Sequence, residues 1–161
     1  MLELLLHLVP FIGFTRVLRG VGIAREVFTE QAKMIDPISS PAPAERYGSG
    51  LALLRRIAGP DAEGVLASLH DVSPDMARIL VELTYGDIYS RPGLETPVRL
   101  LATITSLVAL GDTAVPLRAQ VVAGMSWGWR PQQLDELFAR VEPVVGLDTV
   151  AEARAVLAEV T

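Results

Sequence analysis

The sequence predicts an all-α protein, and three observations lead to that prediction. Apolar residues recur at helical spacing over most of the 161 residues, as they do along helices that bury one face. No stretch alternates apolar and polar residues between turn signals, which is the pattern of a half-buried strand. The eleven prolines and thirteen glycines lie mostly where one apolar period ends and the next begins, so they mark helix boundaries.

The first half of the chain contains five predicted helices. Pro10 and Gly13 end the first. The segment 36–44 is a predicted linker, because its three prolines favour an extended chain. Ser73-Pro74 is a strong helix start, since serine caps a helix and proline suits its first turn. The expected helices span residues 2–9, 15–34, 45–57, 61–69 and 74–88.

The second half begins at a turn, Arg91-Pro92-Gly93, where proline presets φ and glycine accepts a positive φ. Thr96 is the predicted N-cap of the next helix, with Pro97 in its first turn. That helix is apolar nearly all round, so we expect it at the centre of a bundle. The expected helices span residues 98–110, 117–127, 131–141 and 148–160.

Composition excludes several classes of protein. The net charge of −5 argues against a general nucleic-acid binder, which needs clustered lysine and arginine. Cysteine is absent, which excludes disulfides, thiolate zinc sites and cysteine nucleophiles. With only His7 and His70, a histidine-rich metal site is not expected. The start of the chain lacks the basic region and cleavage site of a signal peptide, and no apolar run is long enough for a membrane span. We therefore expect a cytoplasmic protein.

The two ends of the chain resemble each other. Val9-Pro10-Phe11-Ile12-Gly13-Phe14 parallels Glu142-Pro143-Val144-Val145-Gly146-Leu147, and Ala24-Arg25 parallels Ala153-Arg154 with a shift of four residues. Two amphipathic hairpins can also look alike by chance. If the repeat is real, its first copy lacks the rest of its unit and must pack on another unit or subunit. High overall hydrophobicity, 50% of residues, also favours a homo-oligomer.

The motif Tyr85-Gly86-Asp87-Ile88-Tyr89-Ser90-Arg91-Pro92-Gly93-Leu94, followed by Arg99, resembles the carboxymuconolactone decarboxylase family. Tyr47-x-x-Gly50, the end of the apolar helix at Val108-Ala109-Leu110, Ala123 with Gly128, and Pro143-x-x-Gly146 extend the resemblance. It implies the all-α helical bundle shared with alkyl hydroperoxidase D-like proteins. Residues 45–161 are then a complete domain, and residues 1–35 resemble the C-terminal third of such a unit. It further implies no cofactor, a small-molecule substrate, and a homotrimer or homohexamer.

Several residues depart from the family pattern. The family histidine, eight residues before the glycine that ends its helix, corresponds to Gln120, which cannot exchange a proton near neutral pH. Pro116 and Thr113 stand where alkyl hydroperoxidase D-like proteins carry cysteines, which excludes peroxidase or disulfide chemistry. The motif glutamate is Asp87, and both motif tryptophans are tyrosines.

The candidate catalytic residues are Asp87 and Gln120. Asp87 is expected to lie in apolar surroundings that suit proton transfer; its alternative role is an ion pair with Arg91, four residues on. Arg99 suits a substrate carboxylate or an ion pair with Asp87 or Glu95. The other candidate substrate-binding residues are Tyr85, Tyr89, Arg91 and Trp127. Trp127 and Trp129 suit a planar ligand or core packing, and His7 is either a replacement base or a structural histidine.

These residues and the resemblance support two functions. The first is a cofactor-independent enzyme that performs proton transfer, decarboxylation, cyclisation or isomerisation on a lactone, carboxylate or polyketide-like metabolite, in a secondary-metabolic role. The second is a non-catalytic, ligand-binding or structural subunit of an oligomer.

Overall fold

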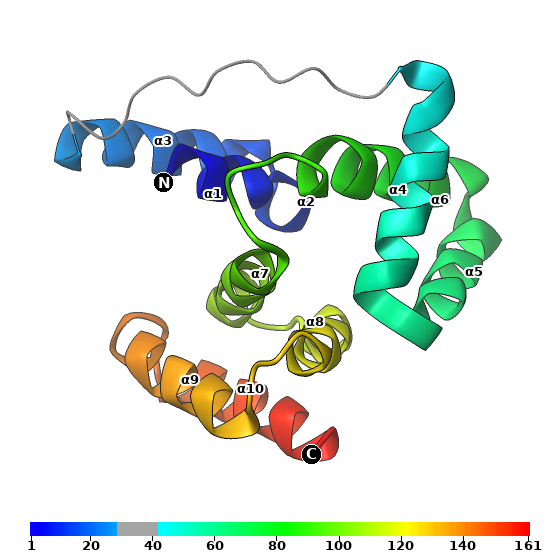
Figure 1. Ribbon diagram of the computed structural model, residues 1–161. Coiled ribbons are helices and arrows are strands. Elements are labelled where there is room, and N and C mark those ends of the chain that lie inside the picture. Colours follow the sequence, from blue (N-terminus) through cyan, green and yellow to red (C-terminus); the bar gives the residue numbers. More distant parts are fainter. Residues whose placement is uncertain (29–41) are drawn as a thin grey trace. The chain divides into compact units, whose positions relative to one another are not determined.

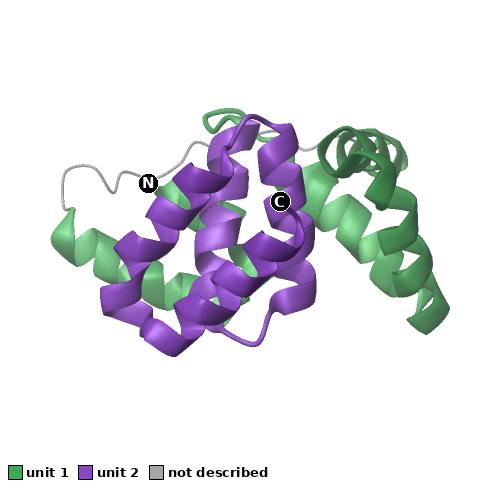
Figure 2. Ribbon diagram, turned by 90° about the horizontal axis from the view of Figure 1, so that it is seen from below, with its two compact units in different colours: residues 1–95 green, residues 96–161 purple. Residues whose placement is uncertain are grey.

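The computed structural model describes residues 1–28 and 42–161, and within them every regular element is a helix (Figure 1). The predicted all-α fold class is confirmed. The described chain divides into two compact units, Met1–Glu95 (unit 1) and Thr96–Thr161 (unit 2) (Figure 2). Residues 29–41, with most of the predicted linker 36–44 and the end of the helix predicted for 15–34, lie outside the described residues. The assignment of residues 1–35 and 45–161 to separate domains stays a prediction.

Unit 1 begins with three helices that follow one another closely. They are α1 (Leu2–His7), α2 (Val9–Ile12) and α3 (Phe14–Val27). The rest of the unit consists of α4 (Pro43–Ala58), the 3₁₀ turn η1 (Gly59–Asp61), α5 (Ala62–Val72), α6 (Pro74–Ile79) and the π-helix η2 (Leu80–Tyr89). Helix α4 lies against η2, α5 lies against α6, and both α1 and α2 contact η2. The predicted start at Ser73-Pro74 is correct.

Unit 2 is a bundle of α7 (Thr96–Leu110), α8 (Ala114–Ser126), α9 (Pro131–Val145) and α10 (Leu147–Glu159). Helix α7 contacts the other three, which agrees with the central position predicted for this apolar helix. Its residues Ile104, Leu107 and Val108 join the buried core with Phe138 and Val150. The indole Nε1 of Trp129 donates to the carbonyl of Pro97 at 2.9 Å, which ties the α8–α9 turn to the start of α7.

The two ends of the chain share a backbone feature at the proposed repeat. Gly13 (φ 80°, ψ 157°) and Gly146 (φ 95°, ψ 157°) each join two helices directly. Counted from these glycines, the buried Val17 corresponds to the buried Val150, with no shift between the copies. The Ala24-Arg25 and Ala153-Arg154 landmarks still differ by four residues when counted from these glycines, and the repeat stays a prediction.

Helices α4 and η2 approach each other closely at two glycines. A Cβ atom on Gly50 would lie 2.4 Å from the carbonyl oxygen of Val81, and one on Gly86 would lie 2.8 Å from the carbonyl oxygen of Arg46. Both distances are too short for any side chain to fit without moving a backbone. Glycine is required at both positions because it has no Cβ atom.

We predict that Gly50→Ala and Gly86→Ala each lower the free energy of unfolding by about 1–3 kcal/mol or more, because the added methyl group forces α4 away from η2. Gly48→Ala is the matched control on the same helix, since a Cβ there would meet nothing within 4 Å. This control should gain about 0.5–1 kcal/mol from its better helix propensity. Chemical denaturation followed by circular dichroism measures all three, and equal effects at positions 48 and 50 would refute the close-contact account.

Candidate functional site

The motif that carries the family resemblance lies on η2, a π-helix of ten residues that continues directly from α6. Most of its side chains are buried, among them Val81, Thr84 and Ile88. π-Helical turns, closed by bonds between residues i and i+5, are rare and occur frequently at functional sites. The sequence predicted a helix here but not this geometry.

The two motif tyrosines form an aromatic cluster with residues from the N-terminal helices. Tyr85 and Tyr89 are stacked, with ring centroids 5.1 Å apart and planes 20° apart. His7 meets Tyr89 edge-on at 4.7 Å, and Phe11 lies 5.5 Å from His7. His7 and both tyrosines are buried. The N-terminal helices therefore pack against the two motif tyrosines in unit 1.

Arg91 is held by a carboxylate from the first helix. Its Nε and Nη2 atoms donate to the two carboxylate oxygens of Glu3 at 3.0 and 2.5 Å. Both side chains are largely buried, with exposed fractions of 15% and 17%. Hydrogen bonding to Glu3 raises the pKa of Arg91 further above its ordinary value. The ion pair that the structure gives Arg91 is therefore with Glu3 of α1, and the alternative pairing with Asp87 four residues earlier stays a prediction.

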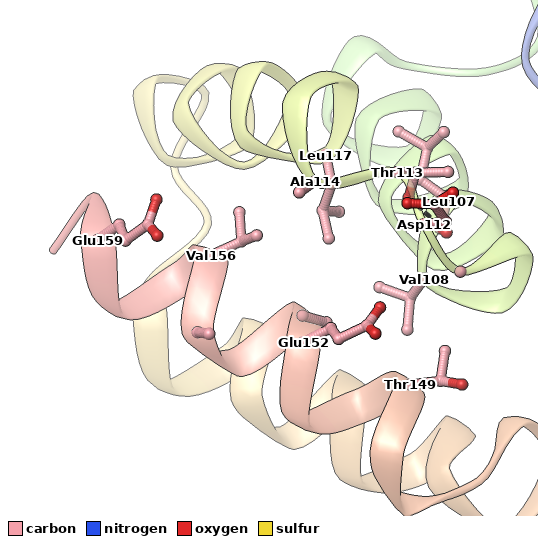
Figure 3. A pocket seen from close by; sticks show the side chains of 13 residues that line it. Leu107, Val108, Asp112, Thr113, Ala114, Leu117, Thr149, Glu152, Val156 and Glu159 are labelled. Atoms are coloured by element: carbon pink, nitrogen blue, oxygen red, sulfur yellow. Dashed lines mark hydrogen bonds between the residues drawn. The ribbon is translucent and has the colours of Figure 1, made fainter.

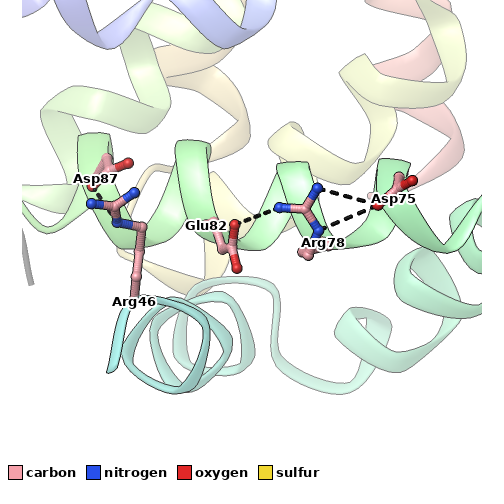
Figure 4. Close-up of polar contacts among 5 residues, drawn as sticks. All are labelled: Arg46, Asp75, Arg78, Glu82 and Asp87. Carbon is pink, nitrogen blue, oxygen red and sulfur yellow. Dashed lines mark hydrogen bonds and ion pairs between the residues drawn. The ribbon is translucent and has the colours of Figure 1, made fainter. Parts of the chain in front are cut away.

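Asp87 instead faces Arg46, which comes from α4 (Figure 4). The Oδ1 atom of Asp87 lies 3.1 Å from Nε of Arg46. These two atoms are buried, and neither has a hydrogen-bond partner among the described residues, so the pair is an ion pair without hydrogen-bond alignment. The two side chains as a whole are 24% and 30% exposed. Asp87 therefore has a cation beside it, because the close approach of α4 at Gly50 brings Arg46 to η2.

The predicted site residues fall on both units. Unit 1 carries Tyr85, Asp87, Tyr89 and Arg91, and unit 2 carries Arg99, Gln120 and Trp127. Arg99 on α7 is almost completely buried. Gln120 on α8 has a buried Oε1 atom without a hydrogen-bond partner among the described residues, and Trp127 is the half-buried C-cap of α8.

Two clefts lie in unit 2, and none of the predicted site residues lines either. The first, of about 280 Å³, lies between α10 and the corner that joins α7 to α8 (Figure 3). Across residues 1–28 and 42–161, no three histidine, aspartate or glutamate side chains gather closely enough to hold a metal ion. None of the helices in this part of the chain is long and apolar enough to cross a bilayer.

Sequence reasoning missed three of the residues around the site. Glu3 carried a signal, since it is a carboxylate in an otherwise apolar helix. Arg46 stands next to the motif residue Tyr47, but nothing in the sequence pairs it with Asp87. Phe11 reads as an ordinary core residue.

We predict an alkaline loss of stability that depends on Tyr85. Burial raises the pKa of Tyr85 to about 12, against about 10 in an unfolded chain. Between these values the unfolded chain has lost the phenol proton and the folded protein retains it, so unfolding is favoured as the pH rises. The free energy of unfolding should fall by roughly 3 kcal/mol across this window.

Tyr85→Phe should lack this component of the pH dependence, and Tyr47→Phe, at an exposed position, should keep it. Denaturation curves at a series of pH values measure the difference. Identical curves for the wild-type protein and Tyr85→Phe would show that Tyr85 does not cause the loss.

We predict that Glu3→Gln lowers the free energy of unfolding by about 1.5–3 kcal/mol, because it leaves the largely buried Arg91 without its charged acceptor. Glu63→Gln is the control: its ion pair with Arg55 is more than half exposed, and such pairs contribute about 0–1 kcal/mol. Urea denaturation compares the two. If Glu3→Gln lowers the free energy of unfolding no more than Glu63→Gln does, the ion pair of Glu3 with Arg91 does not stabilise the packing of α1.

Comparison with known proteins agrees with the resemblance of the η2 motif. The profile of the carboxymuconolactone decarboxylase family matches residues 74–159, a range that includes η2 and nearly all of unit 2. The chain is 31% identical over 104 residues to the 4-carboxymuconolactone decarboxylase of Acinetobacter baylyi (strain ATCC 33305 / BD413 / ADP1). That alignment covers 64% of this chain and 77% of the relative. The protein belongs to the carboxymuconolactone decarboxylase family.

Proposed function

We propose that the protein is a cofactor-independent enzyme that moves a proton on a small lactone, carboxylate or polyketide-like metabolite, with decarboxylation as the first reaction to test. Family membership and the name of the Acinetobacter relative support this reaction class. The observation that carries the proposal is the pair of Asp87 and Arg46 beside the π-helix. Its facing atoms lack hydrogen bonds among the described residues, and both side chains are partly open to solvent.

The reaction needs a cation and a proton carrier. In a decarboxylation the bond from carbon to the carboxylate breaks and CO₂ leaves. The electron pair stays on the carbon, delocalises into a neighbouring carbonyl group, and is discharged when a proton is added. An arginine orients the substrate carboxylate, a role we assign to Arg99, and to Arg91 in a complex where the substrate carboxylate displaces Glu3. Asp87, which is ion-paired with Arg46, first accepts a proton from solvent water and then delivers it to the carbanion carbon. Cyclisation and isomerisation of a polyketide-like substrate use the same proton transfer.

The remaining residues would bind and orient the substrate. Tyr85, Tyr89 and Trp127 offer flat faces to a planar ring or polyene. Gln120 supplies hydrogen bonds without exchanging a proton, and its buried Oε1 atom has no partner among the described residues. A buried acceptor of this kind is usually satisfied by a ligand or water.

The second candidate function is a non-catalytic subunit, either ligand-binding or structural, of an oligomer. Two observations favour it. The bidentate contact with Glu3 already occupies Arg91, and Tyr85 and Tyr89 are buried in the aromatic cluster. In such a protein these residues stabilise the packing of α1 and α2 on η2.

We predict that Asp87→Asn lowers kcat/KM for 4-carboxymuconolactone by about 10²–10⁴-fold, the usual contribution of a positioned acid or base. Asp75→Asn is the matched control, because Asp75 also forms an ion pair with an arginine, Arg78, but is exposed on α6 (Figure 4). The control should keep full activity. CO₂ release and ultraviolet absorbance of the lactone measure turnover.

Undiminished turnover by Asp87→Asn would remove Asp87 from the mechanism. If the wild-type protein binds the lactone in a calorimeter without turning it over, the second function is supported instead. If it neither binds nor converts the lactone, a panel of lactones and polyketide-like acids with the same two variants identifies the substrate class.

A further inference from the structure

Helix α3 presents an apolar and basic surface to solvent. Phe14 and Leu18 are 63% and 66% exposed and lie on one face, because residues four apart are neighbours along a helix. Arg25 follows on the same face, two turns beyond Leu18. The segment 14–28 holds three arginines and one glutamate, in a chain whose net charge is −5. This helix is therefore both more apolar on its surface and more basic than the protein around it.

The first cleft of unit 2 has the opposite character. Its apolar wall includes Val108, Leu117 and Val156, and the carboxylates of Glu152 and Glu159 lie along its α10 side (Figure 3). Asp112 adds a third carboxylate at the α7–α8 corner. Arg118 pairs with Glu159 across part of this rim. The lining contains three acidic residues and no basic one.

We propose that α3 of one copy of the chain docks at this cleft of a second copy. The volume of about 280 Å³ has room for a few side chains and not for a whole helix. Phe14 and Leu18 enter the apolar part of the cleft, and the helix lies across its mouth. Arg25, on the same helix face as these two side chains, then meets the carboxylates of Glu152 and Asp112. Burial of the two apolar side chains supplies affinity, and the opposite charges select the orientation.

This contact joins two different surfaces, so it is heterologous. Such contacts close into rings when the rotation between copies permits it. The proposal is independent of the proposed enzymatic function, since it uses none of the site residues.

The test is the mass of the full chain in solution, measured by sedimentation velocity over a range of concentrations. The wild-type protein should form a closed oligomer. Leu18→Glu should weaken association by at least about tenfold, because it places a charge in an apolar wall beside carboxylates. Val72→Glu is the control, since Val72 is also an apolar residue exposed on a helix of unit 1 (75%), and it should associate like the wild-type protein.

A charge exchange keeps the test decisive if Leu18→Glu fails to fold. Glu152→Arg and Arg25→Glu should each weaken association, and the double variant should recover part of it, because the opposite charges face each other again. A wild-type protein that stays monomeric at every concentration would overturn the proposal. It would also be overturned if Leu18→Glu dissociates the oligomer and Glu152→Arg leaves it intact, because α3 then docks elsewhere.

Discussion

The site in unit 1 depends on the contact between Gly50 of α4 and Gly86 of η2. A missing Cβ atom at each position lets two backbones approach to distances that no other residue permits. Arg46 lies one turn before Gly50, and Asp87 follows Gly86 in the chain, so the same contact that fixes the helices also places the guanidinium beside the carboxylate. The packing of α4 on η2 and the ion pair of Arg46 with Asp87 therefore both depend on these two glycines.

The π-helix extends this arrangement to the N-terminal helices. Tyr85 and Tyr89, four residues apart on η2, stack on each other, and His7 packs on the second ring. Glu3 adds the bidentate contact with Arg91, which follows directly after the helix. An aromatic contact and an ion pair thus hold α1 to η2 in addition to apolar packing. The start of the chain is part of the surroundings of the site and not an appendage to it.

The sequence predicted most of the helices because their signals are local: apolar periodicity, Ser73-Pro74 and the glycines that end helices. Pro10, which was predicted to end the first helix, lies instead in the first turn of α2. It did not predict the π-helix, since no residue pattern distinguishes bonds to i+5 from bonds to i+4. It also missed the partners of the charged motif residues. Glu3 and Arg91 are separated by 88 positions, and only the tertiary fold brings them together. Asp87 and Arg91, four apart, satisfied the local rule for a helical ion pair, but each has a better-placed partner elsewhere.

The two ion pairs beside η2 differ in a way that bears on the chemistry. Two nitrogens of the Arg91 guanidinium donate to the two carboxylate oxygens of Glu3. Both side chains are largely buried, so a ligand would have to break charged hydrogen bonds to enter. Asp87 and Arg46 are more exposed and make a single contact without hydrogen-bond alignment. A substrate hydroxyl group at this pair would gain hydrogen bonds and break none. Admitting a ligand therefore costs less free energy on the α4 side of η2 than at Glu3 and Arg91, which is why the proposed mechanism uses Asp87.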